Sequence, residues 1–156
     1  MIVYNRYFTY PSATGAQALA AEKQSQGYDA LTRVLFETGY RMNRFAFAWN
    51  PKELAHPMGK REGRSFEDAQ ITGATVLVFS TSGKTALALA HQLRFGRPAE
   101  QKPIAVVGVG SPASRDFTEK AGFYDQLLDY SDDGKDLGST LGLTPDSKIV
   151  LVDFGS

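Results

Sequence analysis

The hydrophobic pattern of the chain changes at Ala74. From there on, continuous runs of valine, isoleucine and leucine alternate with segments of helical composition. Such runs are typical of strands buried on both faces of a sheet, and alternating strands and helices form right-handed βαβ units. We therefore predict an α/β fold for residues 72–156, with a Rossmann-like parallel sheet of about four strands and flanking helices. The expected strands are Thr75–Phe79, Ile104–Val109, Gln126–Leu128 and Lys148–Val152, and the expected helices are Lys84–Phe95 and Ala113–Ala121.

Residues 1–71 lack this alternation, and we expect a mixed helical and extended segment that packs on the sheet. Met1–Tyr10 is rich in β-branched and aromatic residues, which favours an extended conformation. Ala16–Gln26 consists of good helix formers, and Asp29 is a residue type that begins a second helix continuing to Met42. Arg44–Trp49 has aromatic residues at alternate positions, which suits either a strand or a buried helix end.

Composition narrows the class of protein. The 17 basic and 17 acidic residues give zero formal charge, which argues against a nucleic-acid or membrane-surface partner. The longest apolar run, around Val76, is far shorter than the ~20 residues of a membrane-spanning helix. Without cysteine, and with only His56 and His91, the chain has no convincing set of zinc ligands. The N-terminus does not resemble a secretory signal, so we expect a soluble, cytoplasmic protein without a metal.

The stretch Ala74–Phe95 contains the main candidate site. The strand Thr75–Phe79 meets the polar turn Ser80-Thr81-Ser82-Gly83, and Lys84-Thr85 begin a helix. A strand that enters a helix in this way brings backbone N–H groups, hydroxyls and the positive end of the helix dipole to one point, which favours a phosphate. The hydroxyls of the turn either bind that phosphate, cap the helix, or do both. The Lys84 ammonium either meets the phosphate or is a solvated lysine.

Gly83-Lys84-Thr85 resembles the end of a P-loop, and Ile149–Asp153 resembles the strand that carries a metal-linked carboxylate in P-loop NTPases. The P-loop pattern requires a glycine five positions before Gly83, and this chain has Val78 there, inside the expected strand. The loop is then too short to wrap a triphosphate. A small P-loop-like NTPase is therefore the least favoured interpretation.

The end of the second expected strand favours a dinucleotide, although no G-x-G-x-x-G follows the first strand. No acidic residue follows Val106–Gly110 to bind a ribose 2′-hydroxyl. Ser111 and Arg115 lie there instead, a hydroxyl and a cation suited to the 2′-phosphate of NADP. Arg115 has a competing role as the surface partner of Asp116 or Glu119.

Residues Ser111–Arg115 and Glu119–Tyr130 resemble the cofactor domain of the medium-chain dehydrogenases/reductases, especially the zinc-independent quinone reductases. In that family a helix ends in a Gly-Ala-Asp-like element, followed by a short strand and a tyrosine. Gly122, Asp125 and Tyr130 match this element, with Phe123-Tyr124 in place of the alanine. The resemblance implies that Ser111, Arg115 and Tyr130 surround the adenosine 2′-phosphate. Val152-Asp153-Phe154-Gly155 is similar to the fourth strand of the family and its following glycine.

A closer resemblance is to the DUF2855 family of quinone-reductase-like proteins, whose members carry a Ser/Ala-rich turn ending in Ser-Lys-Thr-Ala. Ser80–Ala86 is similar to that turn, and Val3–Tyr7 and Leu35–Tyr40 are similar to the segment that precedes it. Medium-chain reductases have a GroES-like catalytic domain before the cofactor domain and further strands after the fourth. The resemblance therefore implies the central part of a longer protein, or a reduced relative.

Three hypotheses follow from the sequence. The first is an NADP(H)-binding, quinone-reductase-like protein that transfers a hydride to a small molecule, with no catalytic residue identified. The second is a non-enzymatic, truncated Rossmann-like binding or interaction module. A homodimer or a missing domain would then cover the edge of the sheet and the aromatic residues Tyr40, Phe45, Phe47 and Trp49, unless these residues form part of the core. The third is the small NTPase.

Overall fold

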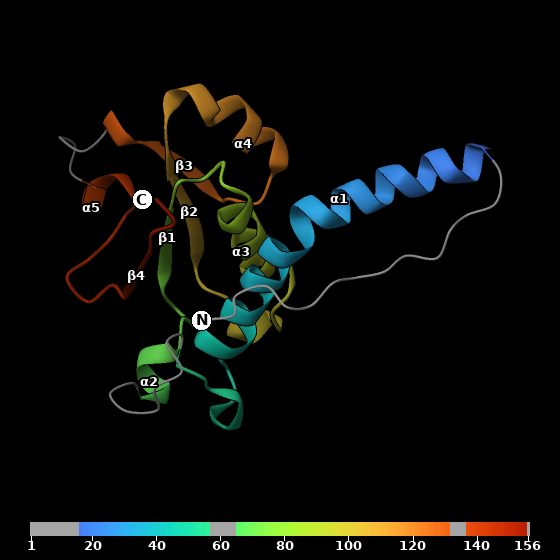
Figure 1. Ribbon diagram of the computed structural model, residues 1–156. Helices are drawn as coiled ribbons and strands as arrows, with labels where there is room; N and C mark the ends of the chain where they lie inside the picture. Colours follow the sequence, from blue (N-terminus) through green and yellow to red (C-terminus); the bar gives the residue numbers. More distant parts are fainter. Residues whose placement is uncertain (1–15, 57–64, 132–136, 156) are drawn as a thin grey trace. The chain divides into compact units, whose positions relative to one another are not determined.

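The computed structural model describes residues 16–56, 65–131 and 137–155 (Figure 1). The chain divides into two compact units, residues 1–34 and 35–156, and residues 35–71 belong to the same unit as the sheet. The expectation of an extended segment at Met1–Tyr10 falls outside the described residues. The second unit contains the strands and all of the candidate site residues.

Helix α1 (Ala16–Arg41) is one continuous helix of 26 residues. The prediction of two helices, with Asp29 at the start of the second, is wrong. The only strong helix breaker between the two expected helices is Gly27, and a glycine in a helix costs only about 1 kcal/mol relative to alanine. Good helix formers on both sides of Gly27 outweigh this cost.

The segment after α1 is a π-helix, η1 (Met42–Ala46). The Phe47 N–H group donates to the Met42 carbonyl at 2.8 Å, the wider turn that defines this helix type. Asn43 and Ala46 are buried. Of the two alternatives for Arg44–Trp49, the structure has the buried helix end and not the strand.

Arg97 stabilises this helix end from the inside of the protein. Its side chain is 5% exposed, and burial lowers the pKa of Arg97 to about 10. The guanidinium donates to the backbone carbonyls of Asn43 (3.2 Å), Phe47 (2.8 Å) and Gln101 (2.9 Å). It also lies 4.7 Å from the ring centre of Trp49. One buried cation therefore satisfies carbonyls that the irregular helix end leaves without partners.

The sheet has four parallel strands: β1 (Thr75–Phe79), β2 (Ala105–Gly110), β3 (Gln126–Asp129) and β4 (Ile149–Val152). Their order in the sheet is β3-β2-β1-β4 (Figure 1). The chain therefore builds the sheet in one direction from β1 to β3, and then crosses back to the other side of β1. This topology confirms the predicted Rossmann-like α/β fold.

The two faces of β1 belong to different parts of the core. Val76 and Val78 pack with Leu89 and Leu93 of α3 (Lys84–Phe95) on one face. On the other face, Leu77 packs in a cluster whose other members are Val107, Val109, Leu128, Phe79, Ala105 and Leu141. Both faces are apolar, which explains why the strand reads as a continuous hydrophobic run.

Short elements connect these parts. They are η2 (Pro51–Glu53), α2 (Phe66–Ala69), η3 (Ala99–Gln101), η4 (Pro112–Ser114), α4 (Arg115–Ala121) and α5 (Leu137–Thr140). Ser65 and Asp68 form a capping box at the start of α2. Within the described ranges, no helix has the length and apolar composition needed to span a membrane.

A substitution at Gly39 of α1 tests the contact between α1 and α3. A Cβ atom there would lie 2.7 Å from the backbone carbon of Ala88 and 2.8 Å from the nitrogen of Leu89. We expect Gly39→Ala to lower the free energy of unfolding by about 1–3 kcal/mol, because backbone atoms of α3 would have to move. Urea unfolding followed by the fluorescence of Trp49, the single tryptophan, measures this change.

Gly27→Ala is the matched control on the same helix, because a Cβ at Gly27 meets nothing within 4 Å. It should leave stability unchanged or raise it by up to about 1 kcal/mol. Equal effects of the two substitutions would contradict the close approach of the two helices at Gly39.

Candidate functional site

The turn Ser80–Gly83 joins β1 directly to α3. Val78 lies within the strand, as predicted, and the Gly83 N–H group closes the turn by donating to the Ser80 carbonyl at 2.8 Å. Ser80 has a φ of 61°, in the left-handed region that glycine usually occupies. For serine this conformation costs about 1 kcal/mol or more, so the surrounding structure must hold the turn in place.

Thr81 supplies one of these restraints. Its side chain is 2% exposed and fits against the backbone of β2. A Cβ atom at Gly108 would lie 2.6 Å from Thr81 Cγ2, and one at Gly110 would collide with Thr81 Oγ1. Both glycines are thus required by the close approach of the turn to β2.

Tyr124 supplies another restraint. Its hydroxyl donates to the Thr81 carbonyl at 3.1 Å, and burial raises the pKa of Tyr124 above its usual value. Arg94 donates to the Tyr124 carbonyl at 3.0 Å, and the next residue, Asp125, accepts from the Val106 N–H group at 2.8 Å. Tyr124, one of the two residues that stand in place of the alanine of the medium-chain reductases, therefore contacts the turn after β1 directly.

The start of α3 is open to solvent. Its N-cap residue is Gly83 and no side-chain hydrogen bond caps the helix, so the capping alternative for the turn hydroxyls does not hold. Ser82, Gly83 and Lys84 are exposed, and Thr85 is partly buried. The first N–H groups of an α-helix have no partner within the helix. Water or an anionic ligand is left to accept from them.

Ser111 and Arg115 lie beyond the end of β2. The Ser111 hydroxyl donates to Ser114 Oγ at 3.2 Å. Arg115 Nε donates to Glu119 at 2.9 Å and Nη1 donates to Asp129 at 3.3 Å. The hydrogen bond with Glu119, followed by the charge of Asp129, raises the pKa of Arg115. The alternative role of Arg115 as the partner of Glu119 is therefore present, and Asp129 is a partner that the sequence did not indicate.

Tyr130 follows β3 and reaches the turn after β1. Its hydroxyl accepts from the Ser80 N–H group at 3.0 Å and lies 3.4 Å from Ser80 Oγ. The side chain is 45% exposed. Since β2 lies between β3 and β1, Tyr130 bridges the carboxyl end of the sheet and helps to hold Ser80 in its unusual conformation.

The segment after β4 also meets the turn. A Cβ atom at Gly155 would lie 2.8 Å from Ser80 Oγ. The Gly155 N–H group donates to Asp153 Oδ1 at 2.7 Å, so this carboxylate stabilises its own loop. The sequence of Val152–Gly155 indicates a strand end with a carboxylate and a following glycine, but not its contact with Ser80. Its proximity to Ser80 depends on β4 pairing with β1, which no local pattern reveals.

The structure thus brings the predicted site residues together in two groups at one edge of the sheet. Ser80 follows β1, beside the point between β1 and β4 where the strand order reverses and where open α/β sheets bind ligands, and Tyr130 reaches it from the end of β3. Ser111 and Arg115 lie at the end of β2. The gap of about 10 Å³ beside Thr81 and these two residues is too small for an organic molecule, so a ligand would lie on the outer surface of this edge.

The described residues contain no group of three or more His, Asp or Glu side chains that could hold a metal ion. His91 packs among the rings of Phe36, Phe95 and Phe123, with centroids 5.1–5.4 Å away. It therefore has a packing role.

The chain was compared with protein families, curated proteins and solved structures. The family model described as "Protein of unknown function (DUF2855)" matches residues 1–156. No curated protein and no solved structure matches the chain. The match extends over both compact units and over every residue of the candidate site.

A double-mutant cycle tests the contact that positions the turn. Gly110→Ala should lower the free energy of unfolding by about 1–3 kcal/mol, because the added methyl group collides with Thr81. Combining it with Thr81→Ala removes the collision. Urea unfolding measures the free energy of unfolding of each variant. The losses of the two single variants, added together, should exceed the loss of the double variant by roughly 1 kcal/mol. Strictly additive losses would show that Thr81 does not pack on Gly110.

Proposed function

The chain belongs to the DUF2855 family, and we propose that it is an NADP(H)-binding protein of the quinone-reductase-like branch of the medium-chain dehydrogenases/reductases. The chemistry that this implies is zinc-independent hydride transfer between the cofactor and a small molecule. We further propose that the protein is cytoplasmic. The proposal rests on the geometry of the carboxyl edge of the sheet and on the resemblance of Ser111–Tyr130 to that superfamily.

One observation carries the proposal. The uncapped start of α3 opens at the point where the strand order reverses, with Lys84 exposed in its first turn. N–H groups and the helix dipole favour an anion there, and Lys84 adds a full positive charge. Hydroxyls and one lysine would then bind the pyrophosphate, in place of the usual glycine-rich turn.

Arg115 is the candidate for the adenosine 2′-phosphate. Its guanidinium has five N–H donors, and the bonds to Glu119 and Asp129 use Nε and Nη1. The Nη2 group makes no hydrogen bond within the described part of the chain, so it remains available to a phosphate. Ser111, at the N-cap of η4, offers a hydroxyl beside it.

The residues present fit the phosphate groups of the cofactor, namely its pyrophosphate and its 2′-phosphate. Bound there, nicotinamide would supply the hydride. Ser82, Lys84 and Thr85 would bind the pyrophosphate, and Tyr130 would keep Ser80 in the conformation that exposes the start of α3. In such enzymes the protein mainly orients the cofactor and its acceptor.

A specific observation favours the second candidate, an interaction module. Ile149 and Leu151 of the edge strand β4 are 47% and 66% exposed. Exposed apolar side chains on a strand at the edge of the described sheet favour association with another chain or domain. The NTPase hypothesis gains no such support, because the turn Ser80–Gly83 is too short to wrap a triphosphate.

Ligand-dependent thermal stability separates these functions. A ligand that binds only the folded protein raises its stability, by about 2.7 kcal/mol at a hundred times Kd. We expect NADPH to stabilise the protein more than NADH. Arg115→Ala should weaken NADPH binding roughly tenfold and abolish the preference for NADPH over NADH. Lys84→Gln should lower the affinity for both nucleotides by a similar factor, because both contain the pyrophosphate.

The control is Lys120→Ala, which removes an exposed positive charge from the same helix as Arg115 and should not change the response to either nucleotide. Stabilisation by Mg-ATP alone would refute the proposal in favour of the NTPase. Indifference to NADPH, NADH and Mg-ATP would favour the interaction module.

A further inference from the structure

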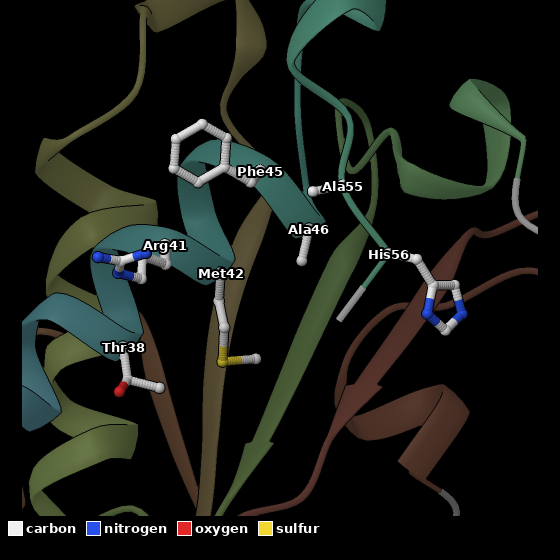
Figure 2. A pocket seen from close by; sticks show the side chains of 7 residues that line it. All are labelled: Thr38, Arg41, Met42, Phe45, Ala46, Ala55 and His56. Atoms are coloured by element: carbon white, nitrogen blue, oxygen red, sulfur yellow. The ribbon is translucent and has the colours of Figure 1, made fainter. Parts of the chain in front are cut away.

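A second concave site lies beside the end of α1. It is an open cavity of about 470 Å³, and Figure 2 shows Arg41 and His56 on opposite sides of Met42. The residues that line it are Thr38, Arg41, Met42, Phe45, Ala46, Ala55 and His56. The volume falls in the range of ~300–1,000 Å³ that is typical of small-molecule sites.

This cavity is separate from the candidate nucleotide site. The turn Ser80–Gly83 lies at the start of α3, whereas η1, which lines the cavity, contacts the other end. Asn43 of η1 donates to the Gly96 carbonyl at 3.4 Å, and Arg97 donates to the Asn43 carbonyl. Since α3 has 12 residues, its ends are about 18 Å apart. A ligand in the cavity would not be the nucleotide.

The apolar wall of the cavity is held in a defined shape. Met42 packs on the main hydrophobic core, and Phe45 O accepts from the Ala55 N–H group at 3.1 Å. Arg97 holds the carbonyls of Asn43 and Phe47 from the other side of η1. π-Helical turns occur frequently at functional sites. The wall therefore offers a preformed surface for an apolar group, and the flexible Met42 side chain can adapt to its shape.

The charge of the cavity indicates which polar group its ligand carries. Arg41 contributes a permanent positive charge, and none of the seven lining residues is acidic. Within the described part of the chain, Arg41 makes no ion pair. A planar guanidinium binds a carboxylate through paired hydrogen bonds, and a single cation balances its single negative charge.

We propose that this cavity binds a small carboxylate with an apolar body. The carboxylate lies at Arg41, and the apolar body lies on Met42 and Phe45. His56 and Thr38 form the polar margin of the site. His56, one of the two histidines of the sequence, is thus among the residues that line this cavity.

The probe is 3-phenylpropionate, with 3-phenylpropionamide as its neutral counterpart of the same size. In protein labelled with ¹³C at the methionine methyl groups, the Met42 signal is assigned through Met42→Leu. We expect 3-phenylpropionate to shift the Met42 signal saturably and to bind roughly tenfold more tightly than the amide, because only the acid makes a charge-assisted pair with Arg41.

Two variants divide the contributions. Arg41→Gln should lower the affinity for 3-phenylpropionate roughly tenfold and leave the affinity for the amide unchanged. Ala55→Leu, at an exposed lining position, should lower the affinity for both compounds, because the larger side chain fills part of the cavity. Lys120→Gln, which removes a distant exposed charge, is the control and should change neither. Arg41→Gln and Ala55→Leu should keep the wild-type response to NADPH, because the two sites lie at opposite ends of α3.

Three results would overturn the proposal. They are a Met42 signal that the acid does not shift saturably, equal affinity for the acid and the amide, and an affinity for the acid that Arg41→Gln does not change. Each is independent of whether the protein binds a nucleotide.

Discussion

The packing of Thr81 on β2 is the contact on which the candidate site depends. Gly108 and Gly110 of β2 have no side chains, and Thr81 occupies the space that side chains at these positions would fill. The carbonyl of the same threonine accepts from the buried hydroxyl of Tyr124, so the loop after α4 is tied to the turn as well. With Thr81 fixed, Ser80 is held in a left-handed conformation, and the start of α3 is left open. The two glycines of β2 thus admit a threonine side chain.

Helix α3 connects this turn with the cavity beside η1. Its first turn provides the open N–H groups, and the residues that follow its last turn support the π-helix through Arg97. Arg97 is a buried cation whose Nε and Nη1 groups donate to carbonyl oxygens, while its buried Nη2 group has no hydrogen-bond partner in the described part of the chain. These bonds offset part of the cost of burying a charge. The same helix therefore positions an anion site for the proposed nucleotide at one end and a cavity of different chemistry at the other.

Local patterns in the sequence predicted the strands, the helix α3 and the turn, because continuous apolar runs and the Ser-Thr-Ser-Gly turn are visible without knowledge of the fold. Val78 excluded a long phosphate loop, because the lack of the P-loop glycine at this position is also visible without knowledge of the fold. Contacts between distant segments were not predictable. The pairing of β4 with β1 places Gly155 beside Ser80, and the end of β3 places Asp129 beside Arg115 and Tyr130 beside Ser80. The π-helix at Met42–Ala46 was also ambiguous, since alternate aromatic residues fit a strand equally well, and the choice depended on Arg97, some 50 residues away.

The central claim is that the start of α3 binds the pyrophosphate of NADP(H). The most direct measurement is a ¹⁵N-amide NMR titration of the full chain with NADPH. We expect the largest chemical-shift changes on the amides of Ser82–Thr85, with changes at Ser80 and Gly155 beside them, and all of these changes should saturate at one common Kd. Binding of NADPH that leaves these amides unchanged, or no binding at millimolar NADPH, would contradict the claim.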